Sequence, residues 1–117
     1  MREPSTGNDG DAARYQRQFA ALPYRFEDGG LRILLLTSRE TRRWVIPKGW
    51  PMSMRKGYET AEKEALQEAG VAGEIGVTPL GTYTYRKRLH FFSSVWCEVE
   101  VYPLEVTRQK LKWRERA

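Results

Sequence analysis

One helix-forming stretch, residues 58–69, constrains the fold of this chain more than any other feature. It contains no Gly or Pro and is rich in Ala, Glu, Lys, Leu and Gln, which are good helix formers. Gly70 follows it directly, where a helix end commonly needs a left-handed residue. Helical spacing predicts one apolar stripe, with Leu66 at its edge, made of Tyr58, Ala61, Ala65 and Ala69.

Runs typical of strands lie on both sides of this helix. Residues 19–26 predict a short strand, and Pro23 favours an edge position or a bulge. The glycines of residues 27–30 indicate a turn, and the apolar run 31–38 is typical of a strand covered on both faces. Further strands or extended links are predicted at residues 44–46, 73–77, 81–89 and 91–102, the last with a period of two. Strands on either side of one helix predict an α+β layered fold.

Length and composition favour one small domain over residues 17–117, preceded by a polar lead-in at residues 1–16. The single cysteine, Cys97, excludes an intrachain disulfide and falls on the apolar face of its strand, which predicts a core position. No apolar stretch approaches the roughly 18 residues of a membrane span, and the N-terminus lacks the apolar region of a secretory signal. A cytoplasmic protein without a membrane partner is therefore expected.

The net charge of +5 favours an anionic partner, although surface solubility explains part of it. Two glutamates of the helix, Glu64 and Glu68, are four residues apart and share one face. A divalent cation between them would turn their repulsion into attraction, and Mg²⁺ suits a site of one or two carboxylates, waters and substrate phosphates. A Glu/Lys-rich helix is also typical of a plain solvated face, in which Glu59 would pair with Lys63.

The stretch 49–71 resembles the signature of the Nudix hydrolases, G-x5-E-x7-R-E-U-x-E-E-x-G-U, where U is aliphatic. The first glycine is matched by Gly49, and the second half is matched by Glu64, Ala65, Glu68, Gly70 and Val71. Three positions depart from the pattern: Arg55 and Gln67 each replace a Glu, and Lys63 replaces the Arg. Outside the signature, RRWVIPKGW and VYPLEV resemble the branch that handles diphosphoinositol and dinucleoside polyphosphates.

The resemblance implies Mg²⁺- or Mn²⁺-dependent hydrolysis of a diphosphate linkage in a small-molecule polyphosphate. By matched position it implies Glu64 and Glu68 as the catalytic carboxylates. The implied metal-binding residues are Gly49, Glu64, Gln67 and Glu68. Because Gln67 keeps an oxygen but no charge, activity is expected to be lower than with a complete signature. A phosphate-binding role is expected of Lys48, and substrate contacts are expected of Arg43, Trp50 and Arg55.

Roles without a substrate contact also stay open for these residues. Lys48 also fits a surface-turn lysine, Arg55 a solvated loop residue, and Trp50 a shield over the loop. His90, the only histidine, is more typical of a structural position than of a catalytic one.

The resemblance further implies a mixed sheet sandwiched between helices, an α/β/α arrangement. Family members usually carry a C-terminal helix on one face, and the chain stops at KLKWRERA, about where that helix would begin. Either the chain is truncated, or another element, such as the second subunit of a homodimer, covers that face.

Two further functions compete with the hydrolase. A binding or regulatory module that keeps the fold but has lost turnover is suggested by the three departures from the signature. An RNA-binding domain would use Tyr83, Tyr85, Phe91 and Phe92 beside the cations of residues 86–88. Those aromatics are more simply packing residues, so a nucleic-acid partner is not expected.

Overall fold

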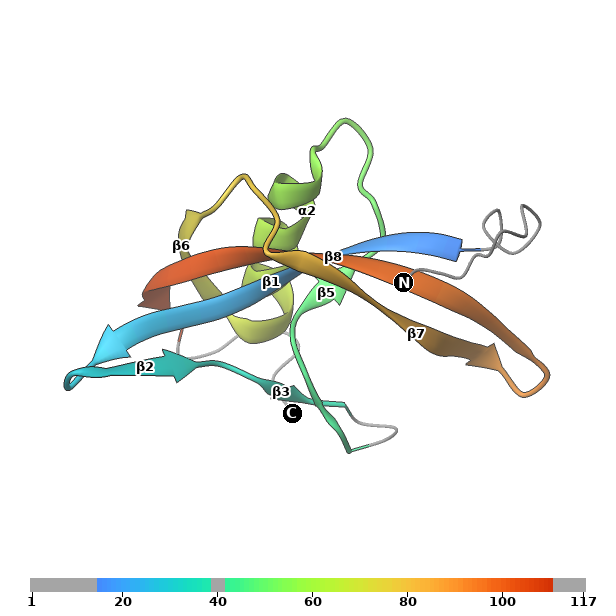
Figure 1. The fold of residues 1–117 in the computed structure, drawn as a ribbon, viewed down its shortest axis with the longest axis horizontal. Helices are drawn as coiled ribbons and strands as arrows, with labels where there is room; N and C mark the ends of the chain where they lie inside the picture. Colours follow the sequence, from blue (N-terminus) through green and yellow to red (C-terminus); the bar gives the residue numbers. More distant parts are fainter. Residues whose placement is uncertain (1–14, 39–41, 111–117) are drawn as a thin grey trace.

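The computed structural model describes residues 15–38 and 42–110 of the chain. They form a mixed sheet with one helix, so the predicted α+β fold is confirmed (Figure 1). The strands are β1 (Tyr15–Glu27), β2 (Gly30–Ile33), β3 (Leu36–Thr37), β4 (Trp44–Val45), β5 (Lys48–Gly49), β6 (Val71–Ile75), β7 (Gly81–His90) and β8 (Ser93–Gln109). The helix α2 (Gly57–Glu64) continues directly into a π-helical turn, η2 (Ala65–Ala69).

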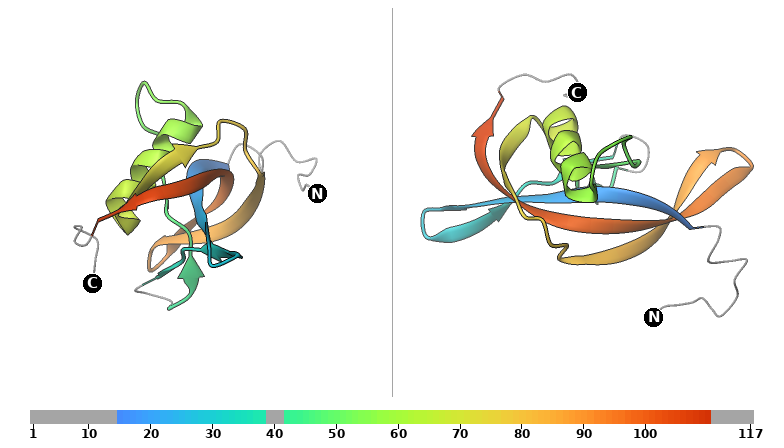
Figure 2. Two further views of the ribbon diagram at one scale, coloured as in Figure 1. Left: turned by 90° about the vertical axis from the view of Figure 1, so that its left-hand side faces the viewer. Right: turned by 90° about the horizontal axis from the view of Figure 1, so that it is seen from above.

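The long strand β8 connects most of the sheet. It runs parallel to β1 and antiparallel to β7 and β6, and β1 in turn pairs with β2 and β5. Strands β3 and β4 form a separate two-stranded sheet. The helix lies over the face of β1 and β8, and the β1–β2 and β7–β8 hairpins project at opposite ends of the molecule (Figure 2).

The predicted apolar stripe of the helix is confirmed. Ala61, Ala65 and Ala69 are buried, and their small side chains let the helix approach the sheet closely. They form one cluster with Ala21, Val71, Tyr102 and Leu104. Tyr58 packs against this cluster at its edge, with its ring centroid 6.4 Å from that of Tyr102. Packing on this stripe therefore fixes which helix face is left for other groups.

Both ends of the helix have identifiable caps. At the start, the Lys56 N–H donates a hydrogen bond to Glu59 Oε1 at 2.7 Å, so Glu59 serves the N-terminus. At the end, Gly70 adopts φ 70° and ψ 24°, as predicted for a left-handed cap. The π-helical turn between Ala65 and Ala69 was not predicted. Such turns are rare and concentrate at functional sites, and this one separates Glu64 from Gly70.

The edge position predicted for Pro23 is wrong. Pro23 is buried in the thirteen-residue strand β1, which has neighbours on both sides. A proline is tolerated here because it lies between the pairing of β1 with β5 and its pairing with β2, which begins at Tyr24. Its carbonyl oxygen accepts a hydrogen bond from the Leu34 N–H at 3.0 Å.

The strand predicted for residues 31–38 is also different from the observed structure. The segment divides into β2 and β3, and Leu31, Ile33 and Leu35 are 56%, 42% and 44% exposed. A continuous apolar run therefore did not mean coverage on both faces, because no other described element packs over these side chains. The preceding turn is confirmed: Asp28 and Gly29 both have positive φ, 52° and 76°, as a tight hairpin requires.

Strands β4, β6, β7 and β8 agree with their predicted positions, with changes at their ends, whereas the short strand β5 was not predicted. Strand β8 begins at Ser93 rather than at residue 91, and it extends to Gln109. Cys97 is buried, as predicted. The predicted lead-in is too long by two residues, because Tyr15 and Gln16 already belong to β1. Residues 1–14, 39–41 and 111–117 lie outside the described part of the chain. No helix in that described part is both long and apolar enough to cross a bilayer.

Replacing Gly73 with Ala should destabilise the fold by about 1–3 kcal/mol. Gly73 lies at a register shift between β6 and β8, where an added Cβ would overlap the Glu105 carbonyl oxygen and lie 2.8 Å from the Thr107 nitrogen. Both atoms belong to the backbone, so neither can move aside cheaply. Urea unfolding measures the effect. Gly81→Ala is the matched control, because an added Cβ there meets nothing within 4 Å, and equal stability of the two variants would contradict this account.

Candidate functional site

The centre of the candidate site is the contact between Gly49 and the side chain of Glu64. Strand β5 pairs with β1 so that Gly49 lies opposite Phe19, and this pairing brings the glycine under the helix. A Cβ added to Gly49 would overlap the Glu64 carboxyl group and lie 2.8 Å from its Cγ. Gly49 is therefore a glycine because the Glu64 carboxyl group occupies the space of a side chain.

The second carboxylate is held by the backbone of the same strand. The Lys48 N–H donates a hydrogen bond to Glu68 Oε1 at 3.1 Å. Since β5 contacts both glutamates, it gathers the two carboxyl groups at the junction of helix and strand.

The two carboxyl groups influence each other's ionisation. The pKa of Glu68 is raised from its ordinary 4.5 to about 7, first by burial and then by the negative charge of Glu64. A hydrogen bond with Glu64 raises this pKa further, whereas the Lys48 N–H opposes the shift. The pair thus favours a proton between its two carboxyl groups when no other cation is near.

This arrangement fits a single divalent cation. A cation can replace the proton that the two carboxyl groups favour, and Mg²⁺ is commonly bound through one or two carboxylates while waters and substrate phosphates complete its shell. Within residues 15–38 and 42–110, no group of three or more His, Cys, Asp or Glu side chains is arranged to hold a metal. The protein's own donors therefore fit a site that a substrate completes.

Lys48 is partly buried beside an aromatic ring and is not a lysine of an exposed turn. Its Nζ lies 5.1 Å from the centroid of the Tyr85 ring, and burial lowers the pKa of Lys48 while the nearby Glu68 carboxylate opposes this shift. Its side chain is partly buried rather than that of a surface turn. The backbone N–H of Lys48 therefore binds the Glu68 carboxyl group, while its Nζ lies beside the Tyr85 ring of the sheet.

The other predicted site residues are more exposed than the two glutamates. Trp50 is 41% exposed on the loop after β5, and Arg55 is exposed near the end of that loop. Arg43 is exposed just before β4. Gln67 is exposed on the π-helical turn, whereas Glu64 and Glu68 are partly buried. His90 is exposed at the end of β7, opposite Ser93.

A group next to Lys48 was missed by the sequence analysis. The Tyr85 hydroxyl donates a hydrogen bond to Gln18 Oε1 at 2.7 Å, and Gln18 is buried on β1. Burial is the main cause that raises the pKa of Tyr85, and it also raises the pKa of the neighbouring Cys97 thiol. Only the pairing of β8 with both β1 and β7 brings these residues together, so no local pattern could have revealed the group.

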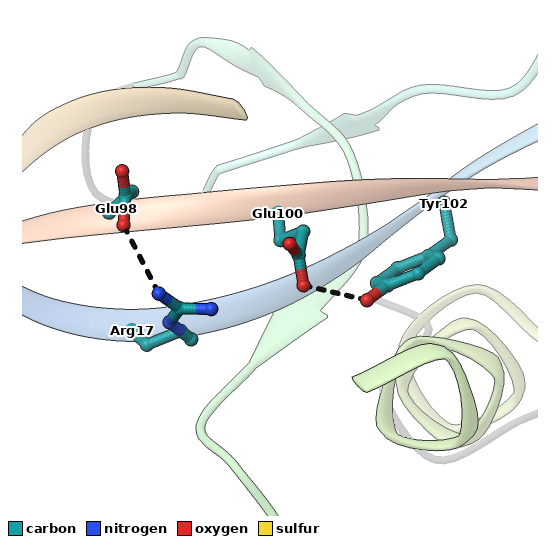
Figure 3. Close-up of polar contacts among 4 residues, drawn as sticks. All are labelled: Arg17, Glu98, Glu100 and Tyr102. Carbon is teal, nitrogen blue, oxygen red and sulfur yellow. Dashed lines mark hydrogen bonds and ion pairs between the residues drawn. The ribbon is translucent and has the colours of Figure 1, made fainter. Parts of the chain in front are cut away.

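Two acidic residues of β8 outside the signature already have protein partners. Tyr102 donates a hydrogen bond to Glu100 Oε1 at 2.6 Å, and Glu98 lies 3.6 Å from an Arg17 nitrogen (Figure 3). Burial, followed by the hydrogen bond to Glu100, raises the pKa of Tyr102 to about 12. Glu100 pairs in register with Phe19, two strands away from Gly49. Glu100 and Gly49 thus pair with the same residue, Phe19, from opposite sides of β1.

Comparison with curated proteins finds relatives over nearly the whole chain. It is 29% identical to Nudix hydrolase 12, mitochondrial, of Arabidopsis thaliana, over 91% of this chain and 62% of that protein. It is 26% identical to diphosphoinositol polyphosphate phosphohydrolase 2 of Homo sapiens, over 97% of this chain and 58% of that protein. The chain therefore spans about three fifths of the length of these relatives. No protein-family model matches it.

Solved structures share the fold. A C. elegans Ap4A hydrolase binary complex aligns with a TM-score of 0.61 and 17% identity, over 86% of this chain and 73% of that one. The Nudix domain of Shewanella oneidensis NrtR, complexed with ADP ribose, aligns with a TM-score of 0.57 and 14% identity, over 85% of this chain and 65% of that one. The chain is thus similar in sequence to a protein named as a Nudix hydrolase, and it shares its fold with a solved Nudix domain.

Proposed function

We propose that this chain hydrolyses a diphosphate linkage in a small-molecule polyphosphate, with Mg²⁺ or Mn²⁺ as the cofactor. The observation that supports this most strongly is the gathering of Glu64 and Glu68 against the backbone of Lys48 and Gly49. Two carboxylates held so close repel each other unless a cation joins them, and burial followed by the charge of Glu64 raises the pKa of Glu68.

The chain's own residues divide the work of such a reaction. Glu64 and Glu68 would hold the cation, and one of them would also orient the attacking water and accept its proton. A bound Mg²⁺ neutralises charge on the phosphate oxygens and lowers the pKa of water. The missing side chain of Gly49 leaves the space that the Glu64 carboxyl group occupies. Gln67 adds an uncharged oxygen at the exposed side, so further cations bind weakly there.

The substrate class follows from the relatives and from the charge of this chain. Their names specify diphosphoinositol polyphosphate and Ap4A, both of which contain phosphoanhydride linkages. We assign substrate contacts to Lys48, Arg43, Arg55 and Trp50, whose cations and indole suit phosphates and a base or an inositol ring. A ligand that approaches from solvent can reach Arg43, Trp50 and Arg55, because all three are exposed.

Phosphate release from a panel of nucleoside, dinucleoside and diphosphoinositol polyphosphates tests the function. With Mg²⁺, the native chain should turn over at least one of these compounds, and the double variant Glu64→Gln/Glu68→Gln should lose about a thousandfold or more of that rate. Glu62→Gln is the control, since it makes the same chemical change on the same helix away from the site. Equal rates for the double variant and the native chain would exclude these glutamates from the reaction.

A binding or regulatory module is the second candidate. It is favoured by the exposed Gln67 and by the fact that only two carboxylates meet at the site in the described part of the chain. Saturable binding of a polyphosphate without turnover in the same panel would support this function instead.

A further inference from the structure

The β7–β8 hairpin ends in a strongly apolar tip, residues 89–92. Phe91 and Phe92 are 86% and 98% exposed, and Leu89 is 48% exposed. The two phenylalanine rings contact each other, with centroids 6.4 Å apart at 65°. The hairpin carries this tip away from the body of the molecule (Figure 1). An exposed apolar patch of this kind is typical of a surface that another molecule covers.

The turn itself does not require these side chains. His90 pairs with Ser93, so Phe91 and Phe92 are the two residues of the turn, a place where Gly, Asn and Asp are favoured. The β1–β2 hairpin uses Asp28 and Gly29 at the equivalent place, both with positive φ. A turn that departs from the usual residues without a gain in packing is typical of a functional position.

Behind the tip, the hairpin is cationic. Arg86, Lys87 and Arg88 precede it, and residues 75–97 contain no Asp or Glu. The Arg86 guanidinium lies 4.9 Å from the centroid of the Trp96 ring on the neighbouring strand, which fixes one cation beside an amphipathic aromatic ring. If the tip entered a lipid layer, the positive charges of Arg86, Lys87 and Arg88 would therefore lie near the lipid head groups.

We propose that residues 86–92 form a docking site for an anionic lipid surface, with Phe91 and Phe92 entering the interfacial region and the cations contacting lipid phosphates. Charge complementarity selects this partner. A second copy of the chain would bring three like charges against three others. The two phenylalanine rings are too steeply inclined to each other to form a stacking platform for consecutive bases. The expectation of no membrane partner rested on the absence of an apolar span, a criterion that does not apply to a tip of this size.

Vesicle sedimentation tests the proposal. The native chain should bind phosphatidylcholine vesicles that contain phosphatidylserine more tightly than pure phosphatidylcholine vesicles, and added salt should weaken this binding. Phe91→Ser/Phe92→Ser should weaken it by about tenfold or more. The matched control is Phe26→Ser, because Phe26 is 69% exposed on the opposite hairpin. Arg86→Gln/Arg88→Gln should remove most of the preference for phosphatidylserine.

Several results would overturn the proposal. These are no vesicle binding by the native chain, or equal binding by the native chain and the Phe91/Phe92 variant. RNA binding or self-association lost in the Phe91/Phe92 variant, without an effect on vesicle binding, would assign the tip to those partners instead. Circular dichroism of each variant checks folding, which should be unchanged because both rings are exposed.

Discussion

Gly49→Ala is expected to lower kcat/KM by about a hundredfold while changing the free energy of unfolding by less than about 1 kcal/mol. The added methyl group would overlap the Glu64 carboxyl group, which lies at the end of a flexible side chain. That carboxyl group can swing away at low cost, so the fold survives. Its displacement, however, removes one of the two oxygen donors from the cation site.

Hydrolysis rates and urea unfolding of the same protein samples separate these two effects. The backbone of Gly49 does not have positive φ, so alanine is compatible with its conformation. Gly81→Ala, which meets open space, is the control for the change from glycine to alanine. A large loss of stability in Gly49→Ala, or full activity, would show that Glu64 is not positioned by this contact.

Glu68→Gln is expected to lower the hydrolysis rate by about a thousandfold and, in metal-free buffer, to stabilise the fold at pH 8. Burial and the neighbouring Glu64 raise the pKa of Glu68 from 4.5 to about 7, so the folded state favours the protonated carboxyl group. Glutamine resembles that protonated form and keeps an oxygen for the Lys48 N–H. The substitution thus exchanges activity for stability, as is common at functional sites.

The sign of the pH dependence follows from the raised pKa. The stabilising contribution of protonated Glu68 is fully present below about pH 4.5, and it is lost as the pH rises through about 7. After allowance for solvent screening, the loss amounts to about 1–2 kcal/mol. Urea unfolding with a chelator at pH 5 and pH 8 should show this loss in the native chain and in Glu62→Gln, but not in Glu68→Gln. An identical pH dependence in all three proteins would contradict the shift.

Local patterns were sufficient to predict the helix and what it presents. The spacing of Ala61, Ala65 and Ala69 identified the buried face, and Gly70 identified the helix end, because both features depend on helical geometry alone. The same periodicity placed Glu64 and Glu68 on one shared face. The tight turn at Asp28 and Gly29 was predictable for the same reason, since its backbone conformation selects residue types directly.

Local patterns failed where neighbours distant in sequence decided the outcome. The apolar run 31–38 predicts a strand covered on both faces, but coverage depends on which elements pack over it. Pro23 favours an edge or a bulge by sequence, yet a gap between two pairing partners accommodates it inside the sheet. The sequence favours Phe91 and Phe92 as packing residues, but both are exposed in the turn of the β7–β8 hairpin. Their exposure depends on where strand pairing ends, at His90 and Ser93, and the local sequence does not give that position.

The sequence by itself determined that one helix bears two carboxylates after a glycine loop, because helix propensity, capping and spacing are properties of neighbouring residues. Only the tertiary structure decided that Glu64 fills the space beside Gly49 and that the Lys48 N–H holds Glu68. These contacts depend on the pairing of β5 with β1, which aligns Gly49 with Phe19 beneath the helix. Strand register is set by packing across the whole sheet, and no short stretch of sequence contains that information.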